Sequence, residues 1–469
     1  MSPDLRALID EFQRQIAELL AENDALKQEV AELRCRLGKD SSNSNKPPSS
    51  DGLGKKPRVA GSLSGQSGKR SGRQRGHKGD TLRASAAPDT IHWHEAGACA
   101  HCWAGLTAAM AVGVEKRQVF DLPAPRLDVA EHQALIYACA CCRRVTKAAF
   151  PAGVVSPVQY GPRIRAAAVY LSAQQLIPED RVGDIMHELF GAGQLCPASI
   201  CAWSAKKACE LAPFEAEIAA MAPVRHLDET GFRIGGKTRW LHTVSTPGLR
   251  HYRVSEKRGA LPTTLKGGVI VHDHFKPYYR LPGVDHALCN AHHLRELKAL
   301  TEIEKEPWAK NMSRLLLRAN AIVRRARERG ADTLAEACLR RITALYDAIV
   351  AQGLAFHEQQ PPLAVRRPGS RGRLARRTGH NLVTRLRDFK GDTLRFLSDF
   401  AVPFTNNTAE QDIRMMNVKM KISGSFRTPA GAKVFATLRS VLATARKHGL
   451  NPLAALTAPA PELIARLTA

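Results

Sequence analysis

A series of short strand patterns between residues 224 and 273 constrains the fold of this chain more than any other feature. The glycine pair Gly235-Gly236 lies between two of these patterns and predicts a hairpin. Asp228 follows the first strand pattern, at 224–227, and Asp273 ends the apolar run at 268–273, so we expect both acids at strand ends. Helical spacing of apolar residues then extends over 290–400 and returns at 407–420, where Glu410 lies. The sequence predicts a sheet, a long helical stretch and a final acid-bearing helix.

These three acids match the ligand set of a two-magnesium phosphoryl-transfer site. Carboxylate oxygens suit Mg²⁺, which takes few protein ligands and keeps several waters. Two such cations can hold both the attacking and the leaving oxygen of one phosphate. We therefore interpret Asp228, Asp273 and Glu410 as candidate catalytic acids and ligands of two Mg²⁺ per active site. Aspartate at strand ends and glutamate on helices are common, so the prediction depends on all three together.

The charge of the chain favours a polyanionic partner. Its 469 residues contain 69 Lys and Arg against 44 Asp and Glu, a formal net charge of +25. Such a chain gains free energy by releasing counterions from phosphates, and double-stranded DNA is the expected partner. Composition leaves open a basic protein of another kind. The sequence has no apolar run of membrane-spanning length and no secretory signal pattern, so we expect a cytoplasmic, nucleoid-associated protein without membrane contact.

Residues 5–37 carry five unbroken heptads. Leu5, Phe12, Leu19, Leu26 and Leu33 form one seam, and Ile9, Ile16, Asn23, Val30 and Leu37 form the other. β-Branched residues at a with leucine at d favour a parallel dimer, and a single Asn at a fixes the register. We therefore expect dimerisation through Leu19, Asn23 and Leu26, in preference to a helix packed on its own chain. The expected assembly is a homodimer or a higher oligomer.

Residues 40–88 read as a flexible basic linker, because serine, asparagine, proline and glycine dominate and cannot build a core. Lys78 is a candidate DNA contact within it, and a solvated spacer is an equal alternative. Further along, Cys99, Cys102, Cys139 and Cys142 form two C-x-x-C pairs. Each pair can supply two thiolates from a tight turn, which predicts one structural Zn²⁺ in a domain spanning 89–155. Strand-like patterns lie between the pairs, at 116–122 and 134–137.

Residues 161–215 predict three short helices, and Lys206 and Lys207 lie on the third. This arrangement fits a helix-turn-helix that enters a DNA groove, and a structural connector fits equally well. An arginine-rich segment at 366–377 includes Arg371 and Arg373, which are further candidates for DNA binding. Arg414 can pair with Glu410 one helical turn away or grip phosphate. Arg427 is a weaker candidate for DNA binding, since a solvated charge explains it as well.

Motifs along the whole chain resemble those of the insertion sequence 66 family, a group of bacterial DDE transposases. They are the tract Ser41–Asp51, Gly76–Gly79, the paired cysteines, Asp228–Gly231, Cys289–Leu297, Thr405–Arg414 and Lys421–Arg427. Two departures are the Arg73-Gln74-Arg75 triplet, where the family often has Gly-Gln-Pro, and Phe232, where Trp is common.

The resemblance implies a DNA transposase that binds element ends, cleaves them and joins 3′-hydroxyls to target DNA, with the three acids as its catalytic residues. The predicted order of a hairpin meander, a fourth strand with an acid at its end and a helix bearing an acid resembles the ribonuclease-H-like fold, so we expect a multidomain α+β chain with such a core. The resemblance also implies small accessory proteins of the same element as partners. The expected segments are a coiled coil at 1–39, the linker at 40–88, the zinc domain at 89–155, a helical DNA-binding region at 156–222, the core at 223–289 and 401–448, a helical insertion at 290–400 and a tail at 449–469. Two alternatives are a catalytically inactive zinc-containing DNA-binding protein and a nuclease without strand transfer.

Several neighbours of the acids have open interpretations. His272 and His274 flank Asp273, and we favour supporting roles over metal ligation because alternate strand positions face opposite ways. Cys289, His292 and His293 would make a second zinc site, but packing at a helix start is favoured since no fourth ligand is evident. Asn406 has two equal interpretations, orientation of substrate and capping of the helix that carries Glu410.

Overall fold

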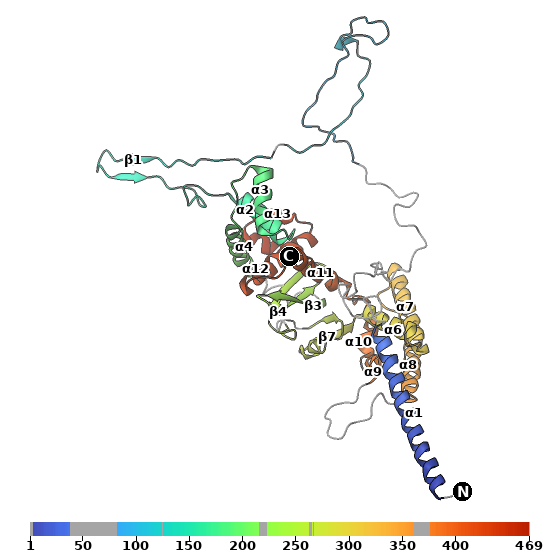
Figure 1. Cartoon of the computed structure of the whole chain (residues 1–469). Helices are drawn as coiled ribbons and strands as arrows, with labels where there is room; N and C mark the ends of the chain where they lie inside the picture. Colours follow the sequence, from blue (N-terminus) through green and yellow to red (C-terminus); the bar gives the residue numbers. More distant parts are fainter. Residues whose placement is uncertain are drawn as a thin grey trace.

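The structure is a computed structural model that describes residues 3–37, 82–123, 125–214, 223–261, 265, 267–360 and 376–468. Within these ranges the chain forms thirteen helices and two sheets, a mixed α+β protein. None of the described helices is both long and apolar enough to cross a membrane. The larger sheet lies at the centre, with helices from 162–211 and from the C-terminal part of the chain beside it and a separate group of helices at one end (Figure 1).

The central sheet has five strands in the order β5-β4-β3-β6-β7. An antiparallel meander comprises β3 (Val224–Ile234), β4 (Lys237–Ser245) and β5 (Arg250–Ser255). The parallel strands β6 (Val269–His272) and β7 (Asp285–Leu288) extend the sheet beyond β3. The β3–β4 hairpin turns at Gly235 and Gly236, whose φ angles of 52° and 77° suit residues without a Cβ. This confirms the predicted hairpin.

Two C-terminal helices cover the meander. Helix α11 (Asn407–Ser423) packs on β3 and β4, and α12 (Pro429–Lys447) packs on β5. Buried Ile413 and Met416 of α11 meet Phe232 and Leu241 of the sheet. The predicted acid-bearing helix at 407–420 is therefore present, and its apolar face holds it against the strand that carries Asp228.

Helices from the middle and the C-terminal part of the chain share one hydrophobic core. They are α2 (Pro162–Ala173), α4 (Pro197–Leu211), α13 (Pro452–Thr457) and α14 (Ala460–Thr468), and α3 (Glu179–Phe190) packs on α2 and α4 in an adjoining cluster. Leu211 of α4, Leu442 of α12 and Leu463 of α14 belong to the same buried cluster. The three helices predicted at 161–215 are present. Residues 449–468 are part of this core, because their apolar side chains are buried against α2, α4 and α12.

The described residues between β7 and α11 form five helices in sequence. They are α6 (Asn290–Glu302), α7 (Pro307–Glu328), α8 (Glu336–Glu358), α9 (Thr378–Asp388) and α10 (Lys390–Ser398). They bury a core of their own that includes Trp308, Met312, Leu316, Tyr346 and Leu386. Because this core is self-contained, the group can interrupt the sheet-bearing part of the chain without disturbing its packing. Helical structure was predicted over this stretch.

The segment from 82 to 155 has almost no buried side chains and extends away from the rest of the protein (Figure 1). It contains a short helix η2 (Ala108–Met110) and the two-stranded sheet of β1 (Ile136–Ala138) and β2 (Val145–Lys147). The strand expected at 116–122 is wrong: the described residues there pair with no strand, and Val119 is 91% exposed. A strand pattern yields no strand when no partner strand lies beside it.

Helix α1 (Pro3–Leu37) runs through all five heptads. Leu19 and Leu26 are 64% and 59% exposed, and Asn23 is exposed as well. The rest of the chain leaves these seam positions open to a partner helix, and the parallel dimer stays a prediction. The linker residue Lys78 and the arginines Arg371 and Arg373 lie outside the described residues.

Candidate active site

Asp228 and Asp273 lie on adjacent parallel strands. The parallel register of β3 and β6 ends at the pair His226 and Val271, and each acid lies two residues further along the chain. The expectation that both acids lie at strand ends needs a correction. Asp273 directly follows β6, whereas Asp228 lies inside β3, because β3 continues its pairing with β4 to Ile234 after its pairing with β6 has ended. Asp228 therefore marks the end of the parallel pairing, and residues two apart share a face.

The charges of the neighbouring acids act on Asp228. Burial raises the pKa of Asp228 well above its ordinary value, and the negative charges of Glu229, Asp273 and Glu410 raise it further. The backbone N–H of Glu229, 2.9 Å from Asp228 Oδ1, opposes this shift. Like charges held together disfavour ionisation unless a cation compensates them. The structure thus brings all three acids into one electrostatic group.

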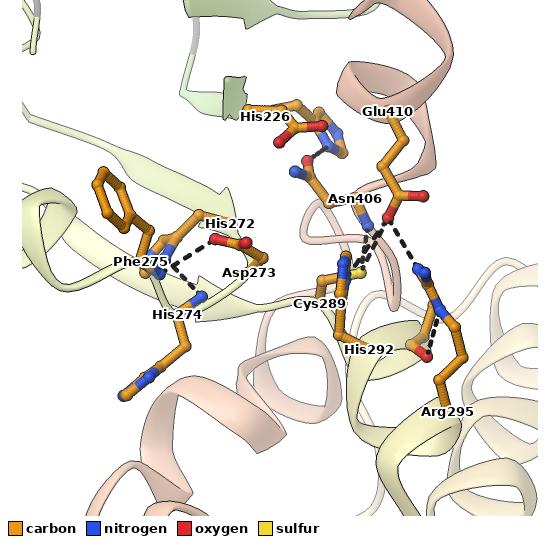
Figure 2. A network of polar contacts seen from close by, with 12 residues as sticks. His226, His272, Asp273, His274, Phe275, Cys289, His292, Arg295, Asn406 and Glu410 are labelled. Carbon is orange, nitrogen blue, oxygen red and sulfur yellow. Dashed lines mark hydrogen bonds and ion pairs between the residues drawn. The ribbon is translucent and has the colours of Figure 1, made fainter. Parts of the chain in front are cut away.

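Asn406 joins three elements at this site. Its side-chain amide donates to Leu227 O at 2.7 Å, so its Oδ1 accepts from His226 Nδ1 at 2.9 Å. Its backbone N–H donates to Cys289 Sγ at 3.1 Å, just before α6 begins. Asn406 is 1% exposed, and its side chain makes no cap bond to α11. The capping interpretation is wrong: Asn406 ties the start of α11 to β3, one residue before Asp228 (Figure 2).

One oxygen of Glu410 collects three partners (Figure 2). Glu410 Oε1 lies 3.4 Å from Arg295 Nη2, 3.6 Å from His292 Nδ1 and 3.9 Å from Cys289 Sγ. Burial lowers the pKa of His292 to about 3, aided by the charges of Arg295 and Arg385. Burial and the Glu410 charge raise the pKa of the Cys289 thiol to about 12. At neutral pH both groups are uncharged, so Arg295 supplies the positive charge beside Glu410.

Within the described part of the chain, Cys289, His292 and Glu410 form the only cluster of three His, Cys, Asp or Glu residues whose ligand atoms all lie within 4.8 Å of one another. His293 is not part of it and contacts Asn290 Oδ1 at 3.1 Å. The carboxylate oxygens of the three candidate catalytic acids do not all lie within 4.8 Å of one another. Sequence spacing could have revealed Arg295, because residues 289, 292 and 295 recur every three positions on one side of a helix.

Glu229 and Asp412, the nearest other acids, are fully engaged elsewhere. Glu229 accepts from Tyr278 and pairs with Arg258 at 2.8 Å. Asp412 pairs with Arg250 at 2.6 Å and accepts from Ser245 at 2.6 Å. Both carboxylates are 1% exposed. Glu229 connects β3 to the short helix η3 (Lys276–Arg280) that follows Asp273, so it steadies the distance between the two aspartates.

The histidines beside Asp273 point to a supporting role. His272 is fully buried, with Nε2 3.2 Å from His286 Nδ1 and Nδ1 accepting from the His274 backbone at 3.1 Å. His274 adopts a φ of 73° and its ring lies against Phe389. Asp273 itself accepts from the Phe275 backbone N–H at 3.1 Å. These contacts shape the loop that presents Asp273.

The two cysteine pairs form matching turns. Cys99 N–H donates to Ala104 O and Trp103 N–H to Cys99 O, and the same two bonds recur at Cys139 with Arg144 and Arg143. Trp103 and Arg143, each just after the second cysteine, have φ angles of 61° and 55°. Backbone N–H bonds lower the pKa of Cys99 and of Cys139. The turns of Cys102 and Cys142 thus resemble each other. No three of the four cysteine sulfurs, however, all lie within 4.8 Å of one another.

The described basic candidates differ in exposure. Lys206, Arg414 and Arg427 are exposed. Lys207 is partly buried, donates to Ala458 O at 3.0 Å and lies 3.4 Å from Glu210. Its ammonium therefore anchors the C-terminal segment to α4. Glu410 pairs with Arg295 rather than with Arg414 among the described ion pairs.

Comparison with known proteins gives the family. The model of a family of unknown function (DUF6444) matches residues 1–83. No curated protein matches the chain. The model described as Transposase IS66 family matches residues 157–434, which include the sheet, all three candidate acids, Arg295 and Asn406. Because this match spans more than half of the 469 residues, the chain belongs to the Transposase IS66 family.

Proposed function

We propose that the protein is a DNA transposase that binds the ends of its element, cleaves them and joins the 3′-hydroxyls to target DNA by two-metal-ion phosphoryl transfer. The observation that carries this proposal is the electrostatic coupling of Asp228 with Asp273 and Glu410 at one edge of the β3–β6 pairing. Burial and the negative charges of the neighbouring acids raise the pKa of Asp228, a cost that a bound divalent cation would offset, and phosphate would complete the coordination of that cation.

The strand order supports a ribonuclease-H-like catalytic core. A meander, a further strand followed by Asp273 and an acid-bearing helix are the features that suggested this fold from sequence, and the parallel strands β6 and β7 beside β3 add support for it. The core comprises 223–289 and 401–448, and α6 to α10 are its helical insertion. The lone helix α1, with its exposed seam, fits a dimerisation element.

The donor set at the acids fits magnesium. Asp228, Asp273 and Glu410 offer only carboxylate oxygens, the ligands that Mg²⁺ prefers. Bound Mg²⁺ would activate a water or a DNA 3′-hydroxyl and stabilise the leaving oxygen. The chain's own contribution is position: Asn406 fixes α11 on β3, and Glu229 with Tyr278 fixes the segment after Asp273. Held rigidly, the acids lose little free energy to reorganisation when charge develops on the phosphate.

We also propose one structural Zn²⁺ at Cys99, Cys102, Cys139 and Cys142. The support is the matching turn at each pair, with backbone N–H groups that stabilise the first thiolate of each. A zinc ion would draw the two turns together and give residues 89–155 the core that their exposed side chains do not supply. DNA is the proposed partner of this region and of the exposed Lys206, Arg414 and Arg427.

The experiment that tests the proposal uses the full chain, DNA that flanks its own coding sequence and Mg²⁺, with strand breaks mapped at single-nucleotide resolution. Wild type should nick at defined positions and join the ends to a target plasmid. Asp228→Asn, Asp273→Asn and Glu410→Gln should each bind DNA without nicking, since each loses a metal-binding charge. Glu358→Gln, an exposed acid on α8, is the matched control and should behave as wild type.

The outcomes separate the candidate functions. Nicks without joined products would indicate a nuclease that lacks strand transfer. DNA binding without any nick in wild type would indicate an inactive DNA-binding protein. Normal nicking by Glu410→Gln would mean that another acid completes the site.

A further inference from the structure

We propose that Arg295 is a phosphate-binding residue of the active site, whose guanidinium passes from Glu410 to the reacting phosphate when DNA and divalent cations are bound. The inference rests on the proposed function and adds a residue to its chemistry. Arg295 lies 3.4 Å from the carboxylate that is the third candidate metal ligand. Its Nη2 makes the shortest ion-pair contact to Glu410 Oε1 among the described residues, and His292 Nδ1 lies 3.6 Å from the same oxygen.

The backbone aims Arg295 at this site. Helix α6 starts directly after β7, at the same edge of the sheet as Asp273, and Cys289, His292 and Arg295 follow one another along one side of it. All three side chains reach toward Glu410 (Figure 2). Arg295 Nε bonds weakly to Ala291 O at 3.4 Å, one turn earlier. Its side chain is 29% exposed, so the guanidinium stays accessible to a polymer that binds over the acids.

Charge balance predicts the exchange of partners. A divalent cation bound to Glu410 satisfies the carboxylate and repels a guanidinium at the same oxygen. The phosphate that arrives with DNA carries negative charge to the same place, and a guanidinium fork fits phosphate oxygens in a bidentate manner. Neighbouring arginines are committed elsewhere: Arg385 pairs with Glu296 at 2.7 Å and Arg258 with Glu229 at 2.8 Å. Arg295 is thus the group best placed to stabilise charge on the phosphate.

The proposal predicts two effects of opposite sign. Removal of Arg295 leaves Glu410 without its competing cation, so divalent metal should bind about two- to fivefold more tightly. The same change removes a charged donor from the transition state, so nicking at saturating metal should slow about 10²-fold. If Arg295 merely maintained the fold, its removal would lower both the metal affinity and the nicking rate, because a distorted site binds metal and DNA less well.

The test uses the full-length protein as wild type, Arg295→Ala, Arg295→Lys and the control Arg387→Ala, an exposed arginine whose partner Asp388 is the next residue. Mn²⁺ binding is measured by electron paramagnetic resonance without DNA, and nicking is measured at saturating Mg²⁺. We expect tighter Mn²⁺ binding and slow nicking for Arg295→Ala. Arg295→Lys should keep the wild-type Mn²⁺ affinity but nick about tenfold more slowly, because lysine lacks the fork.

Two results would overturn this inference and leave the proposed function standing. They are weaker Mn²⁺ binding together with slow nicking in both Arg295 variants, or a wild-type nicking rate in Arg295→Ala. Thermal unfolding checks that each variant is folded. If Arg295→Ala does not fold, the Mn²⁺ affinity and the nicking rate of Arg295→Lys decide the test. If wild type neither binds Mn²⁺ nor nicks DNA, the proposed function fails and the inference fails with it.

Discussion

Replacement of Asn406 by alanine should destabilise the protein and slow its chemistry together. The side chain bonds to His226 at 2.9 Å and to Leu227 O at 2.7 Å, and both partners are buried. Each buried group left without a partner costs about 1–3 kcal/mol, so the variant should lose about 3 kcal/mol of unfolding free energy. For a domain of this size the midpoint should fall by about 6–12 °C.

The matched control is Asn407→Ala, which removes the same side chain from the exposed next residue. Thermal and urea unfolding of both variants give the stability, and the nicking assay gives the rate. Because Asn406 positions the start of α11, the nicking rate of the folded variant should also fall, while Asn407→Ala should match wild type. Equal stability of the two variants, within about 0.5 kcal/mol, would refute the tethering role.

Three further predictions follow from the same structure. Asp228→Asn should raise the unfolding temperature in EDTA while it abolishes nicking. The pKa of Asp228 is raised in the folded state, so ionisation of this carboxyl destabilises wild type as pH rises from about 4 through that pKa. The stability advantage of Asp228→Asn over wild type should therefore grow across this pH window and vanish below it. A stability difference that does not change with pH would contradict this. Purified wild type should contain about one zinc per chain, and the double variant Cys99→Ser/Cys102→Ser should lose it; metal analysis that finds none in wild type removes the zinc site. Asn23→Val should raise the melting temperature of a peptide spanning residues 1–38 and loosen its oligomeric state, and a peptide that stays monomeric in sedimentation at high concentration would exclude the dimer.

The sequence by itself determined the features that depend on local pattern. Heptads require a long helix at 3–37, the Gly235-Gly236 pair requires a tight hairpin, and the spacing of apolar residues requires helices at 161–215 and 290–400. The order of Asp228, Asp273 and Glu410 also suggested which acids belong together. The strand expected at 116–122 failed, because a strand is stable only beside a partner and the sequence of one segment does not reveal one.

Only the tertiary structure decided what surrounds the acids. The β3–β6 register places Asp228 level with Asp273, although Asp228 lies in the middle of its strand. Asn406 is an amide before a helix, a pattern typical of a cap, yet its side chain reaches His226, 180 positions away. Arg295 reaches Glu410 across 115 positions. Such contacts arise because α11 packs on β3 and α6 begins directly after β7, and a side chain's partner across that distance depends on the whole fold.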